Sequence, residues 1–160
     1  MERLLKSKYR IGDKINEDEQ SVTYKGSTLG DGQPITIKIF KRDGLSSPLI
    51  KTLLRDFQPL TTLTHPNIPR YLDGDYGWQG LYFVREYVDG ESVWDLMIYD
   101  RKLTEPQWLS VMTGVCEAVK VAHDQGILHG TLNPGDVFVT KEGQIKVTDF
   151  RLGMTLRGAN

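Results

Sequence analysis

Residues 126–150 of the chain are GILHGTLNPGDVFVTKEGQIKVTDF, the stretch that says most about how this protein folds. Two short runs within it, VFVT and QIKVTDF, are rich in β-branched and aromatic residues and flank Lys141-Glu142-Gly143. Such runs on both sides of a glycine-containing turn are typical of a β-hairpin. The stretch therefore predicts two paired strands that follow a polar loop.

A long helix is predicted immediately before this stretch. Thr104 and Gln107 have the spacing of a capping box, and Gly126 is a helix stop signal. Between them, apolar residues recur at helical intervals. They are Trp108, Val111, Met112, Val115, Val119 and Ala122. We therefore expect a helix over residues 104–125 with one apolar stripe.

The N-terminal part of the sequence carries strand patterns. SVTYKGSTL and PITIKIF alternate apolar and polar residues, and Gly30-Asp31-Gly32 lies between them, so a hairpin is expected. Further strands are expected around residues 70–72 and 81–88. The glycine- and aspartate-rich segment DGDYGWQG is expected to interrupt the chain between these two strands.

A second helix is predicted between these strand regions. Ser47-Pro48 combines a capping residue with a proline at the first helical position. Pro59 removes a backbone hydrogen bond and clashes with the preceding turn, at a cost of about 3 kcal/mol. The helix is therefore expected to kink or stop near Gln58.

Composition excludes several classes of protein. Of the 160 residues, 39% are hydrophobic and 26% are charged, which is typical of a globular domain. The net charge of -1 gives no basic surface for a nucleic acid. Cys116 is the single cysteine, cannot form an internal disulfide, and is expected to be a small buried side chain. Without a long apolar run, we expect a cytoplasmic protein with no membrane span.

Five segments, taken in order, resemble the protein kinase family of eukaryotic Ser/Thr type. They are ITIK, THPNIPRYL, LYFVREYV, GILHGTLNPGDVFV and QIKVTDFRLG. The resemblance implies an α+β fold with a small lobe over residues 1–88, made of a five-stranded antiparallel sheet and one helix. It implies that residues 89–160 hold the hinge, the long helix, the catalytic-loop equivalent and the β-hairpin of an incomplete large lobe.

The resemblance also implies that catalytic parts are missing. The pattern H-R-D-L-x-x-x-N falls on residues 129–136, with Thr131 in place of the catalytic aspartate. Threonine cannot accept the substrate hydroxyl proton near neutral pH, and losing a positioned base lowers the rate by about 10² to 10⁴. Asn133 replaces a lysine of the family, and Arg151 replaces the glycine of D-F-G. No catalytic residue is therefore assigned, and His129 is expected to be a core residue beneath Phe150.

This chain lacks the glycines of the family's glycine-rich loop. Its three glycine positions fall on Asn16, Asp18 and Ser21. Glycines allow backbone N–H groups to approach a phosphate closely, whereas Glu17 and Glu19 add carboxylates to the same space. We expect either repulsion of a triphosphate or a solvated turn without a phosphate cradle.

Other nucleotide positions of the family are partly kept. Lys38 is the retained phosphate-binding lysine, expected near the carboxylate of Asp56 or Asp149, and Arg85 needs an acid or open water. The full set of implied cofactor contacts is Lys38, Asp56, Arg85, Glu86, Val88 and Phe138. Asp136 and Asp149 occupy the metal positions and offer oxygen ligands. ATP and Mg²⁺ are expected to bind weakly at best.

Three functions remain open at this point. The catalytic departures favour an inactive, pseudokinase-like interaction or regulatory module. The alternatives are a nucleotide or small-molecule sensor that uses the degenerate ATP cleft, and residual Ser/Thr kinase activity through Lys38, Asp136 and Asp149. The helix at 104–125 is expected to contact a protein partner or a second copy of the chain, because family elements that bury it lie beyond residue 160. The alternative is that it folds back on the chain's own strands.

Overall fold

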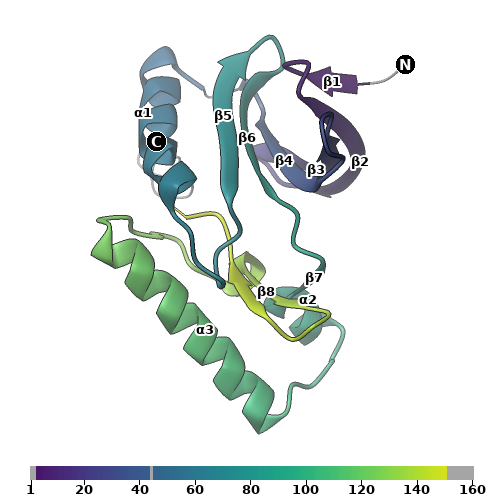
Figure 1. Ribbon diagram of the computed structural model, residues 1–160, viewed down its shortest axis with the longest axis vertical. Helices are drawn as coiled ribbons and strands as arrows, with labels where there is room; N and C mark the ends of the chain where they lie inside the picture. The colour runs from purple at the N-terminus through teal and green to yellow at the C-terminus, as the bar shows by residue number, and fades with distance from the viewer. Residues whose placement is uncertain (1–2, 44, 151–160) are drawn as a thin grey trace. The chain divides into compact units, whose positions relative to one another are not determined.

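The computed structural model of the protein describes residues 3–43 and 45–150, and the chain divides into two compact units (Figure 1). Among the described residues, the sheet unit consists of residues 3–43, 45–61 and 71–87, and the helical unit consists of residues 62–70 and 88–150. The family resemblance predicted a boundary at residue 88. The two units defined by contacts divide between residues 87 and 88 and assign residues 62–70 to the helical unit, and the predicted division into lobes stays a prediction.

The sheet unit is built on a six-stranded antiparallel sheet in the order β1-β2-β3-β4-β6-β5. The strands are β1 (Arg3–Leu5), β2 (Tyr9–Glu17), β3 (Ser21–Thr28), β4 (Pro34–Phe40), β5 (Tyr71–Gly77) and β6 (Gly80–Glu86). The predicted hairpin of SVTYKGSTL and PITIKIF is confirmed as β3 and β4, in which Tyr24 pairs with Ile37. The kinase-like small-lobe fold is thus present, with β1 as a strand beyond the expected five.

The additional strand β1 joins the two edges of the sheet. It pairs with β2 through Leu5 and Tyr9. On the opposite edge, the side chain of Gln79 in the β5–β6 turn donates a hydrogen bond to the carbonyl oxygen of Leu4 at 3.2 Å. Lys6 forms an ion pair with Asp75 of β5. Figure 1 shows β1 beside the β5–β6 turn, so the sheet is curled until side chains connect its first and last strands.

The helix α1 (Ser47–Phe57) starts and stops where capping chemistry and Pro59 require. Ser46 is the N-cap, one residue before the predicted cap, and its hydroxyl accepts a hydrogen bond from the backbone N–H of Leu49. The α-helix ends at Phe57 and the chain continues as the 3-10 helix η1 (Gln58–Thr62). The predicted stop near Gln58 is therefore confirmed.

An aromatic cluster fills the face of the sheet that α1 covers. Phe57 of α1 stacks on Phe83 of β6 with 4.2 Å between ring centroids, and the edge of Tyr71 meets Phe57 at 5.7 Å. A Cβ atom at Gly74 would lie 2.6 Å from atoms of both phenylalanine rings. The predicted interruption at DGDYGWQG was therefore wrong for its first half, because β5 continues through Gly74 to allow this close packing.

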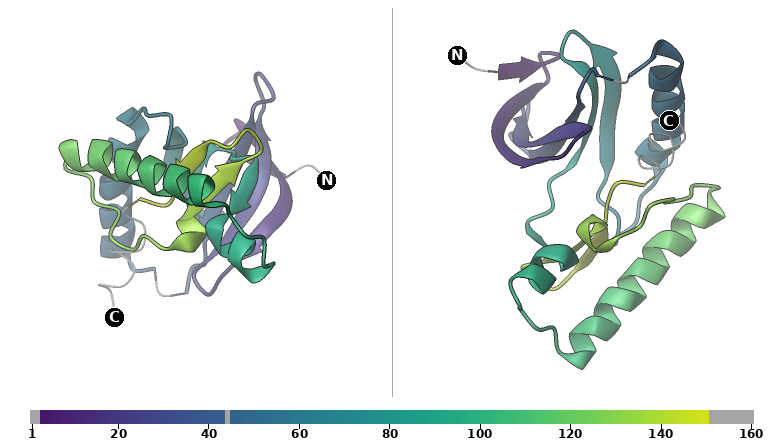
Figure 2. Two further views of the ribbon diagram at one scale, coloured as in Figure 1. Left: turned by 90° about the horizontal axis from the view of Figure 1, so that it is seen from below. Right: turned by 180° about the vertical axis from the view of Figure 1, so that it is seen from behind.

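The helical unit contains a small sheet in the order β7-β8-β9 and two α-helices. Its elements are β7 (Gly90–Ser92), α2 (Val93–Ile98), α3 (Glu105–Asp124), the 3-10 helix η2 (Pro134–Asp136), β8 (Val137–Thr140) and β9 (Ile145–Val147). Figure 2 shows α3 lying along the β8–β9 hairpin. The predicted long helix with its Thr104–Gln107 capping box and the predicted hairpin are confirmed, whereas α2 and β7 were not predicted.

The apolar stripe predicted on α3 is divided between the core and the surface. The buried residues of α3 are Val111, Gly114, Ala118 and Ala122. Val111 joins a core cluster with Val93, Val137 and Ile145, and Val115 packs against it. Trp108 and Met112 are exposed, Val119 is half-buried, and Cys116 is exposed rather than buried as expected.

The expectation that the whole stripe faces a partner was therefore wrong for Val111 and Val115. These side chains contact the strands of their own unit, which was the alternative. The reason is the close approach at Gly114, where a Cβ atom would lie 2.6 Å from Cβ of Ile145. This contact sets the rotation of α3 and selects which apolar residues are covered.

Candidate functional site: the kinase positions

The acidic turn (residues 16–21) connects β2 to β3 and is held by its own side chains. The carboxylate of Asp18 accepts hydrogen bonds from the backbone N–H groups of Gln20 at 2.8 Å and Ser21 at 2.7 Å. Its second oxygen accepts a hydrogen bond from the Ser21 hydroxyl at 2.9 Å. Aspartate commonly closes turns in this way. Two N–H groups of the turn are therefore already bound to a carboxylate of the chain.

The charge of Glu17 is balanced by two lysines. Its carboxylate lies 2.9 Å from Nζ of Lys14 and 3.0 Å from Nζ of Lys41. Hydrogen bonds from Lys14 and then from Lys41 lower the pKa of Glu17 to about 2. The repulsion of phosphate expected from this carboxylate is thus offset by neighbouring cations. The turn differs from a phosphate cradle mainly because its backbone donors are occupied.

The retained lysine and the helix acid both lie in the sheet unit. Lys38 is half-buried on β4, between Thr23 of β3 and Phe83 of β6, with Nζ 6.0 Å from the ring centroid of Phe40. Asp56 occupies the second-last position of α1, and its carboxylate lies 3.2 Å from Nη2 of Arg55. The side chain of Asp56 is only 20% exposed, so α1 does not turn it outward. The pairing of Lys38 with an acid stays a prediction.

Arg85 donates hydrogen bonds to two neutral acceptors of its own sheet unit. It is half-buried on β6, opposite Thr36 of β4. Nη1 donates hydrogen bonds to the hydroxyl of Thr36 at 3.4 Å and to the carbonyl oxygen of Glu86 at 3.2 Å. These two acceptors are uncharged, so these bonds involve no acid, and the expected contact with water is not contradicted because Arg85 is only half-buried. Cross-strand pairing brings Thr36 within reach of Arg85, a contact that only the strand register reveals.

His129 is a core residue of the helical unit, as the family resemblance implied. It is buried, and its ring centroid lies 4.7 Å from that of Phe150. Nε2 donates a hydrogen bond to the carbonyl oxygen of Thr148 at 2.7 Å, which requires the tautomer protonated on Nε2. Burial lowers the pKa of His129, and the bond to Thr148 and the charge of Asp149 only partly oppose this effect.

The rest of the catalytic-loop equivalent (residues 129–136) is organised by Asn133 and Asp136. The side-chain oxygen of Asn133 accepts a hydrogen bond from the N–H of Gly135 at 2.8 Å, and its amide donates to the carbonyl oxygen of Thr131 at 3.1 Å. Asp136 Oδ2 accepts from the backbone N–H of Asn133 at 3.1 Å and from its side-chain amide at 2.6 Å. These reciprocal bonds cap η2 and fix the loop around Thr131.

Asp136 and Asp149 are the two aspartates at the positions that the family uses for a metal ion. Asp136 uses Oδ2 to cap the loop. Asp149 has a left-handed backbone, with φ of 60°. Within residues 3–43 and 45–150, no group of three or more His, Cys, Asp or Glu side chains could hold a metal ion. Asp136 and Asp149 stay predicted metal positions, and we assign no metal-dependent step. Arg151 lies outside the described residues.

The predicted cofactor contacts are distributed over both units. The sheet unit contains Lys38, Asp56, Arg85 and Glu86, and the helical unit contains Val88 and Phe138. Val88 is buried, and Phe138 is half-buried on β8 opposite Lys146. Sequence reasoning missed the self-capping of both loops. The spacings Asp18-x-x-Ser21 and Asn133-Pro134-Gly135-Asp136 are turn and capping signals that could have indicated it.

No helix in the described part of the chain is long and apolar enough to cross a membrane.

Comparison with known sequences identifies the family. Residues 9–160 match the family described as Protein kinase domain, and the chain therefore belongs to the protein kinase domain family.

Relatives from plants and bacteria are named as protein kinases. MAP3K epsilon protein kinase 1 of Arabidopsis thaliana is 27% identical over 160 residues, which cover 99% of this chain and 12% of that protein. CBL-interacting protein kinase 1 of Oryza sativa subsp. japonica is 31% identical over 149 residues, covering 92% of this chain and 32% of that protein. A probable serine/threonine-protein kinase of Streptomyces coelicolor is 28% identical over 159 residues, which cover 96% of this chain and 24% of that protein. The chain thus spans less than a third of the length of these relatives.

Proposed function

We propose that this kinase domain does not transfer phosphate and acts as a regulatory or interaction module. The observation that carries the proposal is Thr131 at the base position, within a loop that Asn133 and Asp136 hold in place. A threonine hydroxyl does not accept a proton near neutral pH. The loop therefore supplies no general base at the position where the family uses one.

The acidic turn supports the same proposal independently. The N–H groups of Gln20 and Ser21 donate to Asp18, so binding of a phosphate by these groups would first have to break two hydrogen bonds. Charge-assisted bonds of this kind contribute about 1.5 to 3 kcal/mol each. Weak binding of ATP follows from this competition, and a single catalytic substitution would not restore it.

Residual kinase activity is the second candidate function. The relatives are kinases, and this chain keeps Lys38, Asp136 and Asp149 at positions that the family uses for phosphate and metal. Nucleotide sensing without chemistry is the third candidate, and it needs the same Lys38. The three candidate functions differ in whether the chain binds nucleotide and whether it transfers phosphate.

Two measurements on the 160-residue chain separate these functions. A thermal-shift titration with ATP and Mg²⁺ reports binding, and transfer of labelled phosphate to the chain or to a basic protein reports chemistry. We expect neither signal. Binding without transfer would support the sensor. Transfer that is lost in Lys38→Met but kept in Lys25→Met, an exposed lysine on the neighbouring strand β3, would establish kinase activity and refute the proposal.

A surface for protein contacts is available on α3. Trp108, Leu109 and Met112 are exposed large apolar side chains on this helix. Exposed apolar groups that lie together often mark interaction sites. We propose that this part of α3 contacts a second copy of the chain or another protein. Sedimentation should then show a dimer that Met112→Glu disrupts and that Lys120→Glu, an exposed change on the same helix, leaves intact. A monomer at all concentrations would refute the homodimer.

A further inference from the structure

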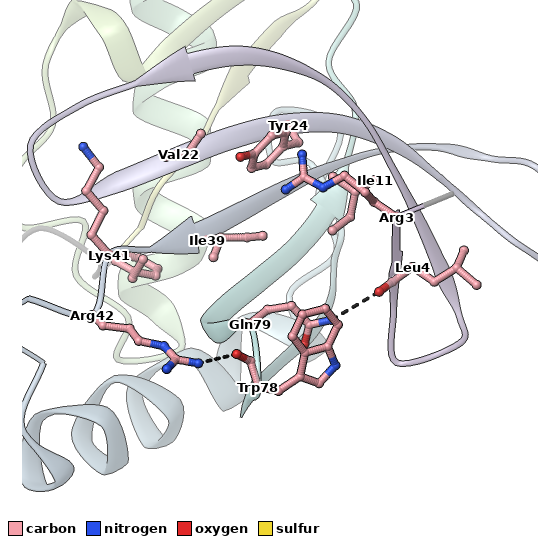
Figure 3. A pocket seen from close by; sticks show the side chains of 11 residues that line it. Arg3, Leu4, Ile11, Val22, Tyr24, Ile39, Lys41, Arg42, Trp78 and Gln79 are labelled. Carbon is pink, nitrogen blue, oxygen red and sulfur yellow. Dashed lines mark hydrogen bonds between the residues drawn. The ribbon is translucent and has the colours of Figure 1, made fainter. Parts of the chain in front are cut away.

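A cavity of about 710 Å³ lies in the sheet unit. Side chains from β1, β2, β3, β4 and the β5–β6 turn line it (Figure 3). Its volume is within the range of about 300 to 1,000 Å³ that is usual for small-molecule sites. It involves none of the predicted catalytic or nucleotide-contact residues.

The inner wall of this cavity is apolar. Ile11, Val22, Tyr24, Ile39 and Phe40 contribute most of it. Ile11 belongs to the buried cluster beneath the cavity, and Tyr24 and Ile39 pack against that cluster. Figure 3 shows Ile11, Val22, Tyr24 and Ile39 on the strands that border the cavity. Such a wall suits the hydrocarbon part of a ligand.

Three cationic side chains border the cavity, and within the described residues two of them form no ion pair with a carboxylate. Arg3 lies over the Tyr24 ring, with its guanidinium carbon 5.0 Å from the ring centroid. Arg42 donates a hydrogen bond to the backbone carbonyl oxygen of Trp78. Among the described residues no carboxylate forms an ion pair with Arg3 or Arg42, whereas Lys41 is paired with Glu17. The entrance therefore carries positive charge that no carboxylate within residues 3–43 and 45–150 neutralises through an ion pair.

The cavity walls are anchored to one another. Gln79 donates to the carbonyl oxygen of Leu4, and Lys6 pairs with Asp75, so β1 is tied to the opposite edge of the sheet. Trp78 lies beside these contacts at the entrance with 78% of its surface exposed. A preformed cavity limits the ordering cost of binding, and a ligand could cover an indole that is otherwise in water.

We propose that this cavity binds an amphipathic organic anion, a carboxylate with an extended hydrocarbon chain. The hydrocarbon would lie against Ile11, Val22 and Ile39, and the carboxylate would be attracted to the positive entrance to which Arg3 and Arg42 both contribute. The apolar wall alone would accept any hydrocarbon, but the two guanidinium groups select a negative head group. Arginine pairs well with a planar carboxylate because its N–H groups match the two oxygens. The residues that line this site include none of the predicted cofactor contacts.

The test compares three probes with the same twelve-carbon chain and different head groups. Dodecanoate, dodecanol and dodecyltrimethylammonium are titrated at concentrations below micelle formation, with binding read by calorimetry. Tryptophan fluorescence gives a second readout, since the ligand is expected to cover Trp78. We expect saturable binding of dodecanoate at least about tenfold tighter than that of the other two probes, a difference equivalent to about 1.4 kcal/mol.

Matched variants locate the site. Arg3→Gln and Arg42→Gln are each expected to weaken dodecanoate binding by about tenfold, in line with the loss of one charge-assisted hydrogen bond. Arg101→Gln is the control, because Arg101 also lies near a tyrosine, with 5.6 Å between its guanidinium carbon and the Tyr99 ring centroid, but belongs to the helical unit. Trp78→Phe is expected to remove the fluorescence change and to leave the calorimetric signal.

Several outcomes would overturn the proposal. Equal affinity for the three head groups would mean non-selective adsorption of hydrocarbon, and no saturable binding would mean an unused cavity. Equal losses in Arg3→Gln and Arg101→Gln would show that the site lies elsewhere. Circular dichroism of each variant checks folding. If Arg42→Gln does not fold, Arg3→Gln still decides the matter, because Arg3 is on the edge strand β1.

Discussion

The acidic turn and the catalytic-loop equivalent both replace parts that active kinases use, and they are stabilised in different surroundings. The acidic turn is at the surface, where Asp18 closes the backbone and lysines balance Glu17. The catalytic-loop equivalent begins in the core, where His129 is packed against Phe150 and bonded to Thr148. Substitutions in the turn should therefore change binding more than stability, and substitutions at the buried end of the loop should do the reverse.

The largest effect is expected where the loop enters the core. Phe150→Ala removes a fully buried ring and leaves a cavity beside His129. Such substitutions typically lower the free energy of unfolding by about 3 to 5 kcal/mol. Urea denaturation measures it, and Phe150→Leu should recover most of the loss. A change below about 1 kcal/mol for Phe150→Ala would show that the loop is not anchored in the core.

The next expected effect is a dependence of stability on pH. The unfolded chain protonates His129 near its ordinary pKa of about 6.5, and burial lowers the pKa of His129 in the folded protein. The stability contributed by the neutral ring is therefore complete above that pH and declines as the pH falls below it. Melting temperatures between pH 7.5 and 5.5 should show this decline. It should be smaller in His129→Gln and unchanged in His123→Gln, an exposed histidine of α3.

A smaller effect is expected at the exposed end of the same loop. Asn133→Ala removes the cap on η2 and the bonds to Thr131 and Asp136. Loss of such a cap costs about 1 kcal/mol of stability, and Asn133→Ser should recover part of it because serine can also cap. Chemical denaturation of both variants measures the difference. Equal stability of Asn133→Ala and the unmodified protein would mean that the loop is fixed without Asn133.

The smallest effect is expected in the acidic turn. Glu17→Gln removes an exposed ion pair with Lys14 and Lys41, and exposed pairs contribute little to stability because water and salt screen them. We expect a melting temperature within experimental error of the unmodified protein at physiological salt. A clear loss of stability that persists at high salt would show that the two loops are equally structural.

The sequence predicted those elements whose signals are local. Capping at Thr104, the stop at Pro59 and the two hairpins follow from residues that are neighbours in the chain. The interruption predicted in DGDYGWQG failed because Gly74 serves contacts with Phe57 and Phe83, which are distant in sequence. The strand β1 has only three residues and shows no alternation that could be recognised.

Predictions about the candidate site also succeeded where the sequence signal was local and missed contacts that depend on residues distant in sequence. His129 was placed correctly because the family motif fixes its neighbours, and the structure confirms the contact with Phe150. The bond from Arg85 to Thr36 was not predicted, because Thr36 reaches Arg85 only through strand register. The division of the α3 stripe depends on the shape of Ile145 opposite Gly114, and no periodic pattern on the helix contains that information.

The closure of the curled sheet by β1 has a consequence for the order of folding during synthesis. Leu4 bonds to Gln79, 75 residues later in the chain, so the first strand is made long before its partner at the opposite edge. At about 5 to 20 residues per second, the ribosome needs roughly 4 to 15 s to synthesise that interval. Until then the hydrocarbon wall of the cavity cannot be enclosed, and the nascent small lobe exposes it to chaperones and to other chains. We expect stalled nascent chains to resist protease at β1 and β2 only after the β5–β6 turn has left the ribosome.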